Sequence, residues 1–396
     1  MPDDVGSGEP THDDKRQPSE SRLTDHQWPV SHDLSRRRSG FSRDAVDVQD
    51  VRATLSRLKP LLQHRQLMVG GHQASREGRL KRSMTGGDRR HYTVIAFGDL
   101  NVDLVLSGMR EAPKFGGEVL AEKLGMHAGG STANAAACCA QLGMPTVLVT
   151  NVGDDSFGDF LLQEMQRYGV LTTHILRHNS LNTGITVSLS TPNDRAFVTH
   201  LGTIDSLTAA DATEELLEQA DHLHVGGYYL QAKLRPDLPT VFRRAHELGL
   251  TTSLDTGFDP AEEWDGGLME ALREVDVFFP NETEAAGITG HEEPQKALEA
   301  LAGCCRVVAL KVGMEGSMAT ADGEEHFAPG LKVPVVDTTG CGDAFDAGFL
   351  HEWLAAKHVE DCLRLGNACG ALIATAPGNA AHLLANRGAQ ALLARQ

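Results

Sequence analysis

Apolar runs and amphipathic segments alternate along the chain from residue 92 onward. Short runs rich in Val, Ile, Leu and Phe predict strands at residues 93–97, 146–150, 222–225, 251–254, 275–279 and 307–312. Between them, segments with helical spacing predict helices at residues 131–142, 157–168, 239–248, 294–302 and 343–356. Strands separated by helices in this way predict an α/β domain with a mainly parallel sheet covered on both faces.

Two stretches interrupt this alternation. Residues 100–107 with 118–124, and residues 183–190 with 195–201, alternate polar and apolar positions with no helix between them. This pattern predicts paired strands that leave the main sheet. We expect these strands, within residues 100–124 and 183–201, to pack together as a small β lid, which would exclude water from a site that it closes over.

The first 91 residues have a different character. Residues 1–43 and 70–90 are polar and lack apolar periodicity, which predicts disorder, whereas residues 48–62 have the spacing of a short amphipathic helix that Pro60 interrupts. We therefore expect an extension at 1–91 and one domain at 92–396. Translation could also begin near Met84, and an intact-mass measurement of the native protein distinguishes this from a genuine basic tail.

Charge divides the chain in the same place. The net charge of -18 combines residues 1–91, with 17 basic against 13 acidic residues (+4), and residues 92–396, with 19 against 41 (-22). A body this acidic is expected to repel nucleic acid and anionic membranes. The uncharged stretch 124–153 contains Asn134, Gln141 and Pro145, so we expect a buried segment there and no membrane span.

The cysteines and the N-terminus bear on the compartment. The chain has seven cysteines and no Cys-x-x-Cys, which disfavours structural zinc and a disulfide framework. The segment Met1-Pro-Asp-Asp shows no basic region followed by an apolar stretch, so we expect no signal peptide. We expect a cytoplasmic protein.

The segment Asp337-Thr-Thr-Gly-Cys-Gly-Asp343 carries the strongest chemical signal. Its glycines precede a predicted helix, so the backbone N–H groups of Gly340, Cys341, Gly342 and Asp343 can converge on an anion. Asp343, in the first helical turn, is suited to take the proton from a substrate hydroxyl. The alternative is a glycine-rich turn with an Asp N-cap. Cys341 is either a small residue that fits a tight turn or a redox-sensitive thiol with a lowered pKa.

Three segments in order resemble one family. The segment ending at Asp343 is similar to the C-terminal signature of the ribokinase-like (PfkB) carbohydrate kinases. Gly129-Gly130-Ser-Thr-Ala-Asn134 resembles their N-terminal signature, and Pro280-Asn281-Glu-Thr-Glu284 resembles their Asn-x-x-Glu motif. The similarity covers roughly residues 93–380. It implies a ribokinase-like three-layer sandwich with a small β lid, and ATP-dependent phosphorylation of a sugar hydroxyl.

The resemblance also implies the substrate side of the site. Asp103 matches a carboxylate that binds substrate hydroxyls, and Gly129, Gly130 and Asn134 match the loop and helix start that contact the sugar. A carboxylate accepts hydrogen bonds from neighbouring hydroxyls, and glycines let a ligand approach the backbone. Taken alone, without the resemblance, Asp103 would be interpreted as a turn residue.

The nucleotide side is implied in the same way. Asn281 and Glu284 match a pair that organises the hydrated Mg²⁺ of ATP, although Asn281 is also a good helix N-cap. Lys311, Gly313 and Asn367 match nucleotide contacts.

Two further expectations come from the family alone. A monovalent cation, K⁺, is expected beside the anion site, with Asp337 and Thr339 as ligands and the carbonyls of Ala374 and Gly378 as further candidates. A homodimer through the lid is also expected.

The substrate stays open between two classes. Ribokinase has Lys where this chain has Ser131, which weakens ribose, and Gly-Gly-Ser-Thr-x-Asn also resembles adenosine kinases. A purine site favours aromatic stacking, and the lid segments offer only Phe115 and Phe197, so we favour a small sugar over a nucleoside. A non-catalytic homologue would have lost one of the motifs, and all are present. The chain has no Gly-Lys and no Gly-x-Gly-x-x-Gly after the first strand, which disfavours a P-loop enzyme and a dehydrogenase.

Overall fold

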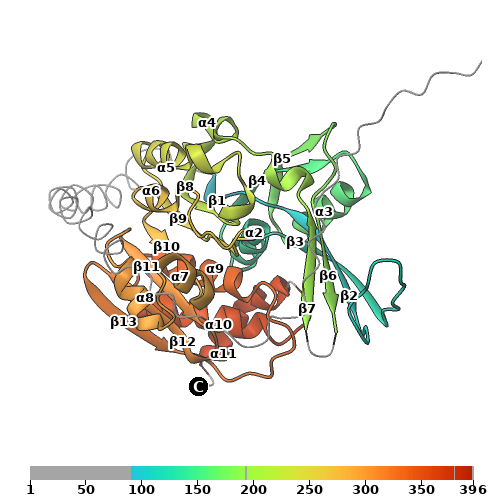
Figure 1. Ribbon diagram of the computed structural model, residues 1–396. Helices are drawn as coiled ribbons and strands as arrows, with labels where there is room; N and C mark the ends of the chain where they lie inside the picture. Colours follow the sequence, from blue (N-terminus) through green and yellow to red (C-terminus); the bar gives the residue numbers. More distant parts are fainter. Residues whose placement is uncertain (1–90, 192–193, 379, 395–396) are drawn as a thin grey trace, which may run out of the picture. The chain divides into compact units, whose positions relative to one another are not determined.

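A computed structural model describes residues 91–191, 194–378 and 380–394, which form a large sheet, a small sheet and the helices around them (Figure 1). Among these residues, the large sheet has the strand order β13-β12-β11-β10-β9-β8-β1-β4-β5. The strands from β11 to β5 pair in parallel, and β12 and β13 add an antiparallel edge. Its strands are β1 (Tyr92–Phe97), β4 (Thr146–Gly153), β5 (Leu171–His178), β8 (Ala220–Val225), β9 (Thr251–Leu254), β10 (Val277–Phe278), β11 (Val307–Val312), β12 (Gly316–Ala321) and β13 (Glu324–Pro329).

Helices cover both faces of this sheet, because alternate residues of each strand face opposite sides. On one face, Ile95 of β1 and Leu223 of β8 pack with helices α5 to α8. On the other face, Val94 and Ala96 of β1 pack with α2, α3, α9 and α10. This is the predicted three-layer arrangement. The described helices are α2 (Ser131–Gln141), α3 (Ser156–Arg167), α4 (Glu214–Leu217), α5 (Leu238–Glu247), α6 (Leu268–Leu272), α7 (Glu282–Thr289), α8 (Pro294–Leu301), α9 (Cys341–Leu354), α10 (Val359–Ile373) and α11 (Gly388–Leu393).

Polar side chains of two neighbouring strands form a hydrogen-bonded group within the sheet. The group consists of His222 and His224 of β8 and Ser253 of β9, which are buried, with Thr251 of β9, which is half-buried. The ring nitrogens of His222 lie 2.7 Å from each hydroxyl, and Nδ1 of His224 lies 2.8 Å from Ser253 Oγ. Burial lowers the pKa of His222 to about 3 and that of His224 to about 4, so both rings are neutral near pH 7.

The small sheet has the order β3-β2-β6-β7, with β2 (Asn101–Ser107), β3 (Lys123–Gly129), β6 (Ile185–Ser190) and β7 (Arg195–His200). The central pair β2 and β6 is parallel, and the outer pairs are antiparallel. The prediction of a strand at 118–124 is wrong. The strand begins at Lys123 and runs to Gly129, because Leu124 and Met126 lie opposite Leu106 and Leu104. It therefore leads directly into the Gly129-Gly130 turn.

Most predicted strands and helices are present, with ends that differ by at most three residues. Outside the segments that we assigned lie strands β5, β12 and β13 and helices α4, α6, α10 and α11; α7 was predicted only as a helix that begins after an N-cap at Asn281. None of the helices in the described ranges is both long and apolar enough to cross a membrane. The expected helix at 48–62 and the start near Met84 lie outside the described residues.

Candidate active site

The predicted site residues come from distant segments and meet where the parallel strands end, the edge at which such sheets bind ligands. Asp343 lies in the first turn of α9, and two residues of the first turn of α2 donate to it. The hydroxyl of Ser131 lies 2.8 Å from Oδ1 of Asp343, and Nδ2 of Asn134 lies 2.9 Å from Oδ2. Burial and the nearby Asp255 raise the pKa of Asp343 to about 7. The C-terminal and N-terminal motifs therefore form one site.

The Gly129-Gly130 turn places Asp103 beside α2. A Cβ at Gly129 would overlap the Asp103 carboxylate, and Gly130 has φ 99°, with space for a Cβ blocked by the Asp99 carbonyl at 2.8 Å. Asn101 donates its Nδ2 to Asp103 at 2.7 Å, while burial raises the pKa of Asp103 to about 6. The carboxylate thus lies against the backbone of the turn.

The start of α9 is open, as an anion site requires. Gly340 has φ 78°, and a Cβ on Gly342 would lie 3.4 Å from Nζ of Lys311. Burial and Asp343 raise the pKa of Cys341 to about 12, and its side chain packs against the apolar cluster beneath α9. A thiol with a raised pKa is a poor redox sensor, which favours the packing interpretation of Cys341.

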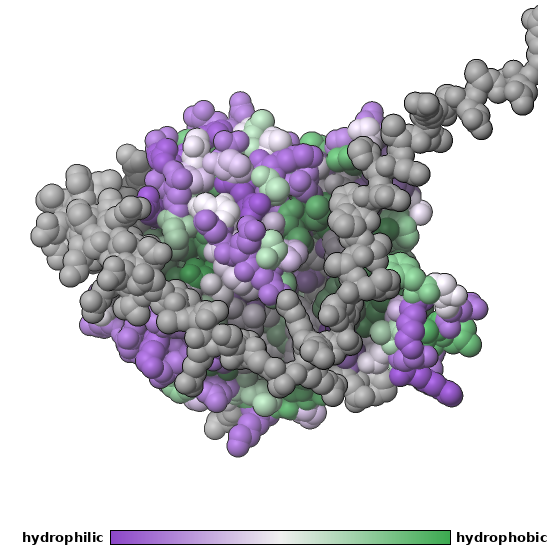
Figure 2. Space-filling view, viewed as in Figure 1, coloured by the Kyte–Doolittle hydropathy of each residue, from purple (hydrophilic) through white to green (hydrophobic). Residues whose placement is uncertain are grey.

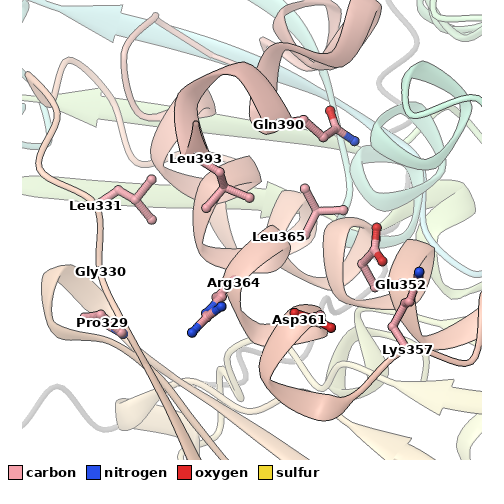
Figure 3. Close-up of a pocket in the computed structure, with 10 residues that line it drawn as sticks. All are labelled: Pro329, Gly330, Leu331, Glu352, Lys357, Asp361, Arg364, Leu365, Gln390 and Leu393. Carbon is pink, nitrogen blue, oxygen red and sulfur yellow. The ribbon is translucent and has the colours of Figure 1, made fainter. Parts of the chain in front are cut away.

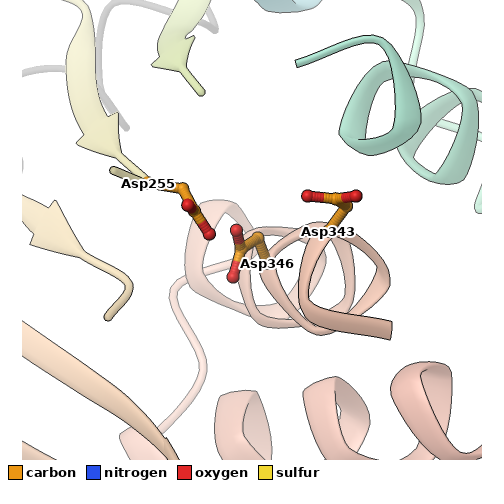
Figure 4. A group of neighbouring side chains, drawn as sticks. All are labelled: Asp255, Asp343 and Asp346. Atoms are coloured by element: carbon orange, nitrogen blue, oxygen red, sulfur yellow. The ribbon is translucent and has the colours of Figure 1, made fainter. Parts of the chain in front are cut away.

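A buried group of charges lies beneath this helix start. Nζ of Lys311 lies 2.6 Å from Oδ2 of Asp255 and 3.2 Å from Oδ1 of Asp346. Figure 4 shows the carboxylates of Asp255, Asp343 and Asp346 close together. One carboxylate oxygen from each residue lies within 4.8 Å of the other two, so the three could hold a metal ion. Burial raises the pKa of Asp346 well above its usual range, whereas Lys311 holds that of Asp255 low despite burial. The lysine therefore balances the charge of this group.

Asn281 and Glu284 form a reciprocal cap at the start of α7. Oδ1 of Asn281 accepts from the Glu284 N–H at 2.9 Å, while the Glu284 carboxylate accepts from the backbone N–H and from Nδ2 of Asn281 at 2.9 and 2.7 Å. The N-cap interpretation of Asn281 is confirmed. Burial and the charge of Asp255 raise the pKa of Glu284 to about 7.

The loop before α9 is held by Asp337. Its Oδ1 accepts from the backbone N–H and the hydroxyl of Thr339 at 3.0 and 2.8 Å, and its Oδ2 accepts from the Gly378 N–H at 3.0 Å. These bonds keep the pKa of Asp337 low despite its partial burial. The Ala374 carbonyl accepts two amides, from Val336 at 2.7 Å and from Asp337 at 3.3 Å.

Two further predicted nucleotide contacts, Gly313 and Asn367, lie beside the ends of β11 and β13. Gly313 begins the turn after β11 with φ 51°. Asn367 of α10 donates its amide to the carbonyls of Ala328 and Pro329 at 2.9 and 3.3 Å, so it ties α10 to the end of β13.

A cavity of about 640 Å³ borders the same end of β13 and lies between it and helices α9 to α11 (Figure 3). None of the residues that line it is a predicted site residue. They are Pro329, Gly330, Leu331, Glu352, Lys357, Asp361, Arg364, Leu365, Gln390 and Leu393.

Sequence reasoning missed three acidic residues of the site. Asp99 accepts the N–H groups of Ser131 and Thr132 at 3.0 and 2.9 Å and so caps α2 from another segment. Asp255 directly follows β9, and Asp346 is one turn after Asp343. Position at a strand end and helical spacing were the signals available for the last two.

Comparison with known proteins agrees with this geometry. A family model described as pfkB family carbohydrate kinase matches residues 93–385. The chain belongs to this family. It is therefore a sugar kinase, a phosphotransferase with a sugar hydroxyl as acceptor, and it binds ATP.

Three relatives illustrate the range of this kinase family. An ATP-dependent ribose-1-phosphate kinase of Halopiger xanaduensis is 33% identical over 290 residues, which are 72% of this chain and 93% of the relative. The ribokinase of Arabidopsis thaliana, solved with ribose and ATP, has a TM-score of 0.67 at 25% identity and covers 76% of this chain and 98% of its own. The adenosine kinase of Sinorhizobium meliloti has a TM-score of 0.64 at 25% identity, covering 76% and 99%.

Proposed function

We propose that residues 92–396 form a cytoplasmic kinase domain that phosphorylates a hydroxyl of a small sugar, with Asp343 as the general base. The observation that carries this proposal is the position of Asp343, at the open start of α9 and in contact with the turn expected to hold the sugar. A base that titrates near 7 is matched to work near neutral pH.

The chemical step follows from this position. Asp343 takes the proton of the substrate hydroxyl while the oxygen of that hydroxyl forms a bond to the γ-phosphorus of ATP. The bond from the γ-phosphorus to the β–γ bridging oxygen breaks, and ADP leaves. ATP supplies the phosphoryl group, and Mg²⁺ offsets the charge of its phosphates. The N–H groups from Gly340 to Asp343 are proposed to stabilise the developing negative charge, at the end of a helix whose dipole favours anions. The Cys341 N–H donates to the Thr338 carbonyl at 3.3 Å and is the weakest of these donors.

Asp103, Gly129, Gly130 and Asn134 are the proposed sugar contacts. Asp103 is ionised above a pH of about 6 and can accept hydrogen bonds from neighbouring hydroxyls. Because Gly129 carries no side chain, the sugar can approach the backbone beside that carboxylate. The small sheet that carries Asp103 is the proposed lid, which would close over the sugar.

Asn281 and Glu284 are the proposed Mg²⁺ side of the site. The capping bonds occupy both carboxylate oxygens of Glu284, which suits contact with the ion through its waters. Lys311 and Gly313 are proposed to face the phosphates. Asn367 would contact adenine through Oδ1, because its amide hydrogens are bonded to carbonyls.

A K⁺ site at the loop before α9 is the remaining cofactor proposal. The ionised carboxylate of Asp337 and the hydroxyl oxygen of Thr339 are hard ligands that suit such a cation. Gly378 lies against the same carboxylate, while the carbonyl of Ala374 already accepts two amides and is the weaker candidate.

A nucleoside is the second candidate substrate, and an aromatic group favours it. Phe258 and Trp264 follow Asp255 in the loop after β9, with ring centroids 5.3 Å apart, and Phe258 is 53% exposed. Such a ring offers stacking surface to a base. The similarity to an adenosine kinase agrees with this alternative.

A screen of ATP consumption separates the candidates. The purified chain is incubated with Mg²⁺-ATP and a panel of pentoses, hexoses, sugar phosphates and nucleosides, with and without K⁺. We expect turnover of a sugar or sugar phosphate and a higher rate with K⁺. Turnover of nucleosides alone would replace the sugar proposal by the second candidate.

A homodimer through the small sheet is supported by its outer face. Met126, Val187 and Val198 lie on that face next to Leu124, in register with Leu104, which packs against the core. Leu124 is 70% and Val198 61% exposed, and Figure 2 shows hydrophobic surface in this part of the molecule. An apolar sheet face of this kind favours burial against a second copy. Light scattering of the wild type and of Leu124→Asp tests it, with a dimer expected only for the wild type.

A further inference from the structure

Both oxygens of the proposed base are held by the first turn of α2. Asn134 donates to Oδ2 of Asp343 and already has a proposed role as a sugar contact. Ser131 donates its hydroxyl to Oδ1 at 2.8 Å, and neither the family signature nor the proposed mechanism gives it a task. A carboxylate oxygen has a second lone pair, so these bonds leave room for a substrate hydroxyl.

Hydrogen bonds of Ser131 and of its neighbour Thr132 fix the position of Ser131. The Asp99 carboxylate accepts its backbone N–H at 3.0 Å and that of Thr132 at 2.9 Å. The hydroxyl of Thr132 accepts the N–H groups of Asp99 and Gly226, both at 3.2 Å. Asp99 is 3% and Thr132 0% exposed, so the first turn of α2 is anchored to the ends of two strands. Its orientation directs the Ser131 side chain at α9.

We infer that Ser131 is a positioning residue for phosphoryl transfer, which holds the carboxylate of Asp343 in the orientation that receives the substrate proton. The inference rests on the proposed function, in which Asp343 is the base. A hydrogen bond from a hydroxyl restricts rotation of the carboxylate and stabilises its charged form.

The charges around Asp343 set the direction of the effect. Burial and Asp255 at the end of β9 raise its pKa, while Asn134 and Ser131 of α2 and Lys311 of β11 lower it. Asp346, on the same helix, and Glu284 of α7 belong to the same buried group, and burial raises the pKa of each. Removal of the Ser131 hydroxyl therefore takes away one of the contacts that favour ionised Asp343.

The first test compares Ser131→Ala and Ser131→Thr with the wild type. We expect Ser131→Ala to lower kcat by about 10- to 100-fold, as for a hydrogen bond to a charged group, with the KM for ATP unchanged. The rising part of its pH–rate profile should move to higher pH. Ser131→Thr keeps a hydroxyl and should restore both. Ser180→Ala, at an exposed position, and urea midpoints of all variants control for general damage.

The second test places Ser131→Ala in the Asp343→Asn background and measures single-turnover rates. If Ser131 acts through Asp343, the double variant should be no slower than Asp343→Asn alone. An equal further loss in that background would overturn the inference, as would a Ser131→Ala profile that matches the wild type. A wild type that phosphorylates no acceptor would instead refute the proposed function itself.

Discussion

The buried pair of Lys311 and Asp255 gives a prediction that can be worked from the structure. Replacing Lys311 by Met removes the ammonium and keeps a side chain of similar length. Asp255 would then lose its cation at 2.6 Å, and Asp346 its contact at 3.2 Å. Asp255 is 4% exposed and Asp346 is fully buried, so water cannot replace the lost partner.

The expected cost is about 3–5 kcal/mol, the range for removing one partner of a buried ion pair. This is a large share of the roughly 5–15 kcal/mol by which a folded domain is stable. Lys311→Met with Asp255→Asn leaves no unbalanced charge at the pair, so it should recover most of the loss. The pair Arg243–Glu274 has side chains 53% and 27% exposed, and Arg243→Met should cost about 0–1 kcal/mol.

Reversible urea unfolding at pH 7.5, followed by circular dichroism, measures these differences in the free energy of unfolding, provided that the variants share the same dependence on urea concentration. At pH 4.5 the Lys311→Met loss should shrink, because Asp255 without its lysine takes up a proton more readily. A loss within about 1 kcal/mol for Lys311→Met would refute the idea that the lysine balances this group. So would a double variant as unstable as the single one.

Two further predictions concern pH. The value of kcat/KM should rise as pH increases through about 7 and then level off, because Asp343 must be ionised to accept a proton; a profile that is flat from pH 5.5 to 8.5 would contradict this. His222, with a folded pKa of about 3 against about 6.5 when unfolded, binds a proton only in the unfolded chain between these values. Protonation of His222 in the unfolded chain should therefore lower the free energy of unfolding of the wild type by about 1.4 kcal/mol per pH unit as pH falls from 6 to 4. Urea denaturation at several pH values should show that His222→Asn reduces the dependence of the free energy of unfolding on pH. The same pH dependence for the variant and the wild type would contradict this prediction.

The layered fold could be predicted from the sequence because short local patterns mark most of its strands and helices. Apolar β-branched runs such as 93–97 and 307–312, separated by helical spacing, are strong local patterns, and both became strands. The strand at 123–129 was placed too early because its pairing partner β2, and not its own composition, sets its register. The helix α7 was predicted only through its start, the N-cap at Asn281, because the polar residues Asn281 and Glu284 were considered mainly for their chemistry; together they cap that helix.

The site was predictable only where residues lie within motifs. Asp343 and Asn134 belong to signatures, and the structure brings them to 2.9 Å of each other. Asp255 lies in no signature, and its contact to Lys311 crosses 56 positions of sequence. Ser131 lies within a signature, but nothing in that signature gives it a role beside Asp343, 212 positions away. Long-range contacts of this kind depend on the strand order, which local patterns do not determine.

The role of Asp343 is the central claim, and Asp343→Asn tests it most directly. With the acceptor found in the screen, single-turnover transfer from Mg²⁺-ATP is compared with that of the wild type, and ATP binding is measured in parallel. Loss of a general base should slow transfer by about 10²- to 10⁴-fold while ATP binding stays nearly unchanged. Transfer at close to the wild-type rate would contradict the account.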